Sequence, residues 1–144
     1  MPPLLEIEDL SIFFHTEENI VKSVRNLDLT IHKGETLALV GESGCGKSVT
    51  ALSAMRLIPT PPGKFESGRI LFEGQDLLQA SEVEMQNIRG NEISMIFQEP
   101  MTSLNPIFTV GDQIIEAIHL HQNKTASQAR ELALNVLHQV TMPS

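Results

Sequence analysis

The hydrophobic positions in the first forty residues predict three β-strands. Residues 4–14 alternate in part between apolar and polar side chains, and residues 24–31 alternate with a period of two over their second half. Residues 36–40, TLALV, are nearly all apolar, which is typical of a strand buried on both faces. Polar turns at 16–19 and 32–35 separate these segments. The chain therefore begins as a β-rich region.

Apolar residues that recur about every 3.6 positions predict helices in the rest of the chain. The pattern covers residues 47–57, 110–118 and 125–140, and a shorter helix is expected between 81 and 90. The proline-rich stretch at 59–63, PTPPG, cannot continue a helix and should end the first of them. The second half of the chain is therefore predicted to be mainly helical.

Capping signals and two further strands complete the expected order of elements. Ser81 begins an S-x-x-E pattern and Thr125 begins a T-x-x-Q pattern, the spacing of a capping box. Residues 68–72 read as an edge strand, and residues 92–97 read as another buried strand. Strands and helices mixed around buried strands indicate an α/β fold.

Composition narrows the class of protein. The 144 residues carry 10 basic and 18 acidic side chains, a net charge of −8, which argues against nucleic acid as the main partner. No apolar run approaches the length needed to span a bilayer, and the first ten residues have no signal-peptide pattern. The single cysteine, Cys45, cannot form an internal disulfide, which suits a reducing cytoplasm.

The strongest chemical signal is the segment GESGCGKS, which fits the pattern G-x-x-x-x-G-K-[ST]. Its glycines let the backbone turn tightly, so that N–H groups and the following helix N-terminus can face phosphate oxygens. Lys47 would reach the β- and γ-phosphates, and the hydroxyl of Ser48 would be a ligand of Mg²⁺. The expected nucleotide-binding residues here are Gly41, Glu42, Ser43, Gly44, Cys45, Gly46, Lys47, Ser48 and Val49.

Nearly the whole chain resembles one family. The segments that carry the resemblance are LLEIEDLSIFFHT, NLDLTIHKGETLALVGESGCGKSVTAL, SGRILFEGQDLL and IRGNEISMIFQEPMTSLNPIFTVGDQIIEAI. They are similar to the ATP-binding subunits of ABC transporters, most of all to the branch that imports dipeptides, oligopeptides and glutathione. The resemblance implies the P-loop NTPase fold of ABC ATPases, with ATP and Mg²⁺ as cofactors.

The same resemblance implies a division of the chain within the N-terminal portion of that fold. Residues 1–108 would form an antiparallel β subdomain and part of the nucleotide-binding core. Residues 109–144 would begin the helical subdomain. The expected partners are membrane-embedded permease subunits and a second ATP-binding subunit, at the cytoplasmic side of the inner membrane.

Two residues outside the phosphate loop gain roles from the resemblance. Phe14 matches the aromatic position that stacks on adenine, with Phe13 as the alternative because the following turn varies in length. Gln98 matches the glutamine whose side-chain oxygen reaches Mg²⁺ or its water. An amide at the carboxyl end of a buried strand also lies where α/β sheets bind ligands. The loop from Pro100 to Pro106 would then contact the membrane subunit.

The segment ISMIFQE has a second interpretation. A hydrophobic strand followed by an acid also describes a Walker B element, with Glu99 as a general base. Gln98 occupies the place of the expected aspartate, and the flanking residues match the family segment that carries the Mg²⁺-binding glutamine rather than the Walker B segment. His119 and His121 are two residues apart and so lie on different faces of a helix, which argues against a shared metal.

The chain contains no LSGGQ-type signature, no strand ending in Asp-Glu and no switch histidine after one. We therefore assign no catalytic residue and expect ATP binding without hydrolysis by these 144 residues, which read as truncated before the signature. Two other functions stay open. A GTPase or small-molecule kinase would show an N-K-x-D motif or an arginine-rich lid, and neither is visible. A non-hydrolysing or nucleotide-free interaction module would differ in its affinity for ATP.

Overall fold

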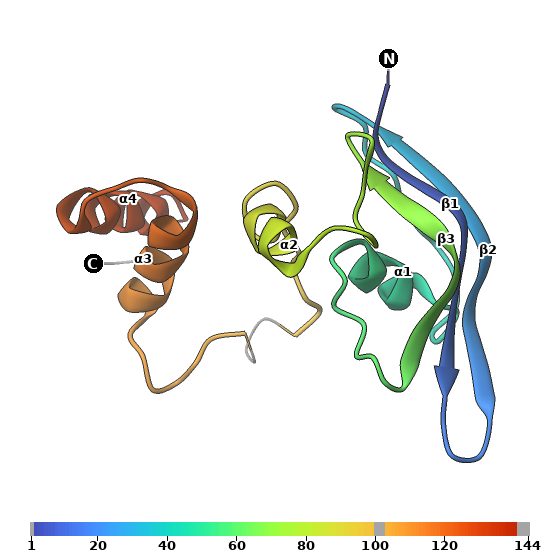
Figure 1. Cartoon of the computed structure of the whole chain (residues 1–144). Coiled ribbons are helices and arrows are strands. Elements are labelled where there is room, and N and C mark those ends of the chain that lie inside the picture. Colours follow the sequence, from blue (N-terminus) through green and yellow to red (C-terminus); the bar gives the residue numbers. More distant parts are fainter. Residues whose placement is uncertain (1, 100–102, 141–144) are drawn as a thin grey trace. The chain divides into compact units, whose positions relative to one another are not determined.

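The computed structural model describes residues 2–99 and 103–140 and divides into two compact units (Figure 1). The first unit ends at Met85 and the second begins at Gln86, and each is described by itself. The predicted division at residues 108 and 109 concerns the family's subdomains and stays a prediction. Pro100, predicted to shape the loop after Gln98, lies outside the described residues.

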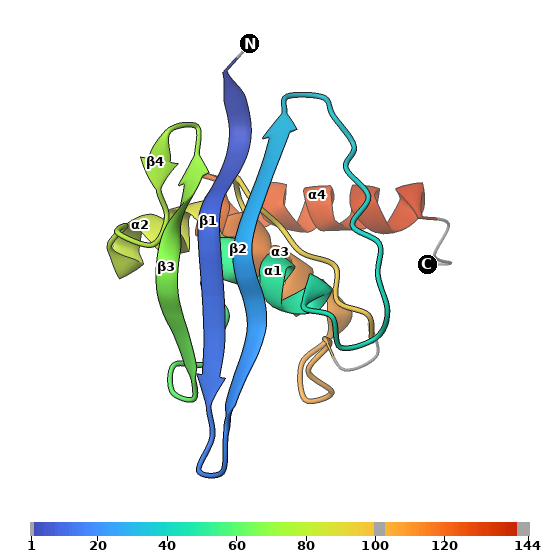
Figure 2. The same ribbon diagram turned by 90° about the vertical axis from the view of Figure 1, so that its right-hand side faces the viewer.

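The first unit is built on a four-stranded antiparallel sheet with the order β2-β1-β3-β4 (Figure 2). β1 (Pro3–His15) and β2 (Ile20–His32) form a long hairpin. β3 (Gly63–Phe72) pairs with β1, and the two-residue β4 (Gln75–Asp76) pairs with the end of β3. The strand that was predicted at 68–72 is confirmed and begins five residues earlier, at Gly63. β4 pairs with the last two residues of β3 and covers the edge of the sheet at that point.

A β-bulge lets β1 bury residues that simple alternation would place on opposite faces. Ile7 and Leu10 are three positions apart, yet both are buried together with Ile12. The register with β2 shifts between Ile7 and Leu10, where Asp9 has φ 47°. On β2, Asn26 has φ 45° and donates from Nδ2 to Asp9 Oδ1 at 2.6 Å. The extra residue of the bulge therefore returns Leu10 to the core face.

One helix covers that face of the sheet. α1 (Lys47–Ala54) follows the phosphate loop and packs against β2 (Figure 1). The core around it is made of Val24, Met55, Ile58, Ile70, Leu77 and Met85. The helix that was predicted for residues 47–57 is confirmed, although it ends three residues earlier.

The remaining helices follow the sequence prediction closely. α2 (Glu82–Ile88) spans the division between the units, and α3 (Val110–His121) and α4 (Ala126–Gln139) form a helical pair in the second. Ile118, Ala129 and Ala133 are buried at the centre of that pair. Among the described residues, no helix is both long enough and apolar enough to cross a bilayer.

Two predicted buried strands are wrong. Residues 36–40 form no strand, and of residues 92–97 only Ile93 makes an isolated bridge, with Arg89. Val40 is 89% exposed and Ile96 is 95% exposed. A strand satisfies its backbone groups through a neighbouring strand. Within the described residues neither segment has such a neighbour, so the apolar pattern alone does not make it a strand.

Candidate phosphate-binding site

The loop from Gly41 to Gly46 connects residues 36–40, which form no strand, to α1. Gly44 and Gly46 adopt φ values of 81° and 92°, a conformation that glycine reaches without steric cost. Gly46 has a second constraint, because a Cβ atom there would lie 2.4 Å from the backbone oxygen of Ser23 on β2. The end of the loop is thus held against the sheet by a contact that only glycine permits.

The N-terminus of α1 differs from the starts of α2, α3 and α4. Ser81, Thr109 and Thr125 each accept a backbone N–H from the first turn of α2, α3 and α4. Gly46, the N-cap of α1, provides no side-chain acceptor. A helix start with unsatisfied N–H groups and a positive dipole end favours an anion. The residues present therefore fit a phosphate group.

Lys47 closes the loop on itself. Its Nζ donates to the backbone oxygens of Gly41 at 2.7 Å and Glu42 at 2.5 Å, and lies 3.4 Å from Cys45 Sγ. A Cβ atom on Gly41 would lie 2.6 Å from the same sulfur, so Gly41 leaves room for the Cys45 side chain. The ammonium group thus lies within the loop that is predicted to surround the phosphates.

The first turn of α1 carries the other predicted residues. Ser48 is exposed and Val49 is half-buried. Glu42, Ser43 and Cys45 are exposed in the loop. The hydroxyl of the buried Thr50 donates to the Gly46 oxygen at 3.0 Å, which ties the first turn to the loop. Thr50 was not among the predicted residues, although serine and threonine commonly bond back to the preceding turn.

A hollow of about 490 Å³ lies between the loop and β2. Its lining includes three basic residues, Lys22, Arg25 and Lys47, together with Val21, Val40 and Thr50. Basic residues in the lining of such a hollow favour an anion. The hollow therefore suits a polyphosphate with an apolar moiety near β2.

Electrostatics also shape the turn before the loop. The backbone N–H of His32 donates to Glu35 Oε2 at 2.7 Å, and His32 Nδ1 lies 3.1 Å from the same oxygen. These contacts, the backbone one first, hold the pKa of the Glu35 carboxyl below its usual value. The turn 32–35, with Gly34 at φ 79°, confirms the sequence prediction.

The two aromatic candidates lie next to each other on β1. Phe14 is half-buried and pairs with Val21 of β2, one of the residues lining the hollow. Its ring edge would lie 3.3 Å from a Cβ atom on Gly63. Phe13 has the Lys22 ammonium 5.2 Å from its ring centroid. Adenine stacking on either ring stays a prediction.

Gln98 lies in the second unit, whereas the phosphate loop lies in the first. It is exposed and, with Phe97, Glu99 and Ser103, lines an open hollow of about 670 Å³. Its role toward Mg²⁺ therefore stays a prediction. His121 of α3, which was considered as a metal ligand, packs against Gly90, where a Cβ atom would lie 2.9 Å from Nε2.

Comparisons with known proteins agree on one family. A family model described as "ABC transporter" matches residues 24–143. An oligopeptide transport ATP-binding protein of Bacillus subtilis (strain 168) is 53% identical over 97% of this chain and 39% of its own length. A dipeptide transport ATP-binding protein of the same organism is 48% identical over 99% of this chain and 43% of its own. The chain thus spans about two fifths of these relatives.

A more distant relative and a solved structure extend the comparison. A glutathione import ATP-binding protein of Escherichia coli O1:K1 / APEC is 46% identical over 97% of this chain and 23% of its own length. A dimeric, post-hydrolysis ATP-binding cassette bound to ADP and Pi has a TM-score of 0.82 at 20% identity, over 97% of this chain and 58% of that one. That likeness establishes the fold, and it confirms the predicted α/β fold class of ABC ATPases.

Proposed function

The chain belongs to the ABC transporter family, and from this premise we propose that it binds ATP as part of the ATPase subunit of a peptide importer. The observation that carries the proposal is the glycine-rich loop that leads into the uncapped N-terminus of α1, with the Lys47 ammonium inside it. The peptide class is supported by relatives named for oligopeptide, dipeptide and glutathione transport.

The predicted residues would contact different parts of MgATP. The backbone of the loop 41–46 and the first turn of α1 would hold the phosphates, with Lys47 as their cation. Ser48 would be a ligand of Mg²⁺, which neutralises phosphate charge when bound. The role of Gln98 toward Mg²⁺ is proposed from the family resemblance alone. Phe14 would stack on the adenine.

Binding rather than turnover is the expected property of these 144 residues. The sequence contains no signature segment and no strand ending in Asp-Glu, so nothing in it would activate water. In the ATPase subunit of an importer as a whole, hydrolysis would be coupled to transport.

The proposed partners are permease subunits and a second ATP-binding subunit at the cytoplasmic face of the membrane. Three apolar residues in and after the loop that follows Gln98 are exposed and would suit a protein contact: Leu104, Ile107 and Phe108. The dimeric form of the similar cassette supports the second subunit.

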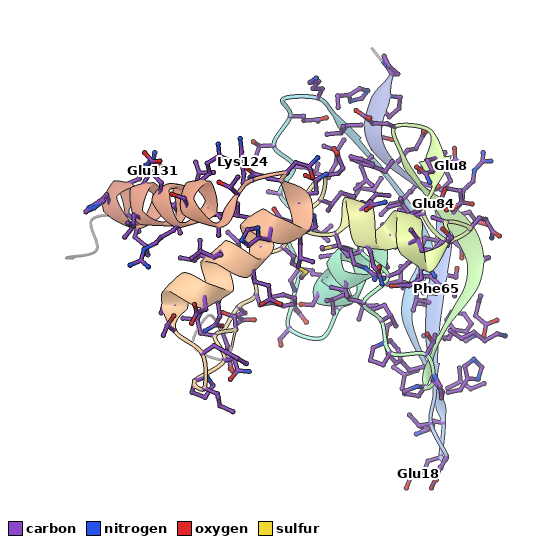
Figure 3. All side chains as sticks on the ribbon, turned by 60° about the vertical axis from the view of Figure 1, so that its left-hand side comes forward. Glu8, Glu18, Phe65, Glu84, Lys124 and Glu131 are labelled. Carbon is purple, nitrogen blue, oxygen red and sulfur yellow. The ribbon has the colours of Figure 1, made fainter. Side chains whose placement is uncertain are left out.

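Competition of MgATP and MgGTP against a fluorescent ATP analogue tests the proposal. The parent chain should bind MgATP, and Lys47→Ala should weaken binding about tenfold or more, about 1.4 kcal/mol. Lys124→Ala removes a lysine between α3 and α4 and is the matched control (Figure 3). Parent-like affinity in Lys47→Ala would contradict the proposed site, and a preference for GTP would favour a different P-loop NTPase.

One observation favours a second candidate, a nucleotide-free interaction module. Leu37, Leu39 and Val40 are neighbouring apolar residues that are 45%, 46% and 89% exposed, and such a cluster on a surface is typical of a contact with another protein. Absence of ATP binding by the folded parent chain would favour this candidate over the first.

A further inference from the structure

The C-terminus of α1 ends in a motif that usually requires glycine. The N–H of Leu57 donates to the oxygen of Leu52 at 2.9 Å, and the N–H of Arg56 donates to the oxygen of Ser53 at 3.0 Å. These two bonds define a Schellman motif with Arg56 at the left-handed position, φ 51°. An arginine is disfavoured there, whereas glycine is not. The helix therefore ends on a residue whose side chain, unlike that of glycine, can form bonds elsewhere.

The guanidinium of Arg56 reaches a segment more than twenty residues away. Nη1 donates to the backbone oxygens of Leu77 at 3.3 Å and Ala80 at 2.5 Å. Nη2 lies 3.9 Å from Glu82 Oε2, and the side chain is only 27% exposed. A planar, permanently charged group with several donors suits such a convergence of carbonyl groups.

The segment that receives Arg56 is itself firmly held. Leu77 is fully buried and Ala80 is nearly so. Ser81 and Glu84 form a reciprocal cap at the start of α2, with the Ser81 N–H 2.7 Å from Glu84 Oε2 (Figure 3). Arg56 thus joins the end of α1 to an ordered turn that leads directly into α2.

We propose that Arg56 is a positioning residue that links the phosphate loop to the segment Leu77–Met85. α1 has eight residues, a rigid rod of about 12 Å at 1.5 Å per residue. The phosphate loop lies at one end of it, and Arg56 follows two residues after the other end. A phosphate that orders the first turn therefore also constrains the last turn and, through Arg56, the start of α2. The inference rests on the proposed binding of ATP and adds a regulatory consequence of it.

Amide hydrogen exchange of residues 77–85, with and without MgATP, tests this link in the full chain. MgATP is added at a concentration about 100 times its dissociation constant. Hydrogen exchange then slows by up to about 100-fold at those amides that exchange only when local unfolding releases the nucleotide. We expect slowing of at least about tenfold in the parent. In Arg56→Gly we expect about twofold or less, because the segment then opens independently of α1.

The variants separate the link from a purely structural role. Arg56→Gly places the favoured residue at the left-handed position, so the helix end should persist while the guanidinium is lost. Arg56→Asn, which also tolerates this conformation and is too short to reach Ala80, provides the same test if the glycine variant fails to fold. Arg69→Gln removes a different arginine, which pairs with Glu8 on the sheet, and should behave as the parent does.

The outcomes distinguish the two proposals. Direct measurement of ATP binding by the parent comes first, and its absence overturns both. Binding without slowed exchange at 77–85, or equal slowing in the parent and Arg56→Gly, overturns the link alone. Slowing that is lost in Arg56→Gly and kept in Arg69→Gln supports it.

Discussion

A Cβ atom on Gly46 would lie 2.4 Å from the carbonyl oxygen of Ser23, so the last residue of the phosphate loop touches the backbone of β2 directly. This contact positions the start of α1 on the sheet. It also means that the loop depends on glycine for space as well as for its φ of 92°.

Gly46→Ala should therefore destabilise the first unit and weaken ATP binding. The left-handed conformation alone costs an alanine about 1–2 kcal/mol, and overlap with backbone adds about 1–3 kcal/mol. Gly34→Ala is the control, because Gly34 has φ 79° with nothing within 4 Å of its Cβ position. Urea unfolding should show a clearly larger loss for Gly46→Ala, and equal losses would mean that the Ser23 contact carries no energy.

Cys45 offers a chemical probe of the same loop. Its thiol is exposed, and its sulfur lies 3.4 Å from Lys47 Nζ. Maleimide should label it readily, and MgATP should slow the labelling because the nucleotide would cover the loop. Equal rates with and without MgATP would place the nucleotide elsewhere.

The cap of α2 predicts a dependence of stability on pH. The Ser81 hydroxyl, and secondly its backbone N–H, hold the pKa of Glu84 below the usual 4.5. When folding lowers the pKa of a carboxyl, that group contributes its full stabilisation at pH values above its pKa in the unfolded chain. The contribution is lost as the pH falls through its pKa in the folded chain. At pH values below about 4.5, the melting temperature of the parent should therefore decrease more steeply with falling pH than that of Glu84→Gln.

Glu18→Gln provides the comparison for that titration. Glu18 is exposed in the turn between β1 and β2, far along the sequence from the α2 cap (Figure 3). In Glu18→Gln, as in the parent, the melting temperature should decrease with falling pH more steeply than in Glu84→Gln. Superimposable pH profiles for the parent and Glu84→Gln would rule out the cap as a source of the dependence.

The second unit allows a test of helix capping by itself. Thr125 Oγ1 accepts the N–H of Gln128, and the Gln128 side chain accepts the N–H of Thr125. Thr125→Ala should cost about 1 kcal/mol of stability, whereas Thr125→Ser should cost little. Hydrogen exchange in the first turn of α4 measures this, and unchanged exchange in Thr125→Ala would show that the cap contributes nothing.

Local signals in the sequence predicted local structure well. The S-x-x-E and T-x-x-Q patterns predicted the starts of α2 and α4, because the bonds of a capping box join residues only three apart. The glycine pattern of the phosphate loop likewise predicted where α1 begins. In the two capping boxes the determining contacts lie within one turn of chain.

Features that depend on distant residues were not predictable in the same way. Residues 36–40 and 92–97 have the composition of buried strands, but a strand also needs a neighbour to pair with. The bulge at Asp9 depends on Asn26, and the contact of Gly46 with Ser23 joins a loop to a strand. Arg56 gave no sign in the sequence of its bonds to Leu77 and Ala80.

The central claim is that phosphate binds at the glycine-rich loop and the start of α1. Amide NMR spectra recorded during titration with MgATP test it most directly. The largest shifts should fall on Gly44, Gly46, Lys47 and Ser48, while amides of α4 such as Glu131 stay unchanged and adenosine alone leaves the loop amides in place. A folded chain whose loop amides do not move with MgATP, or move no more than Glu131, would contradict the claim.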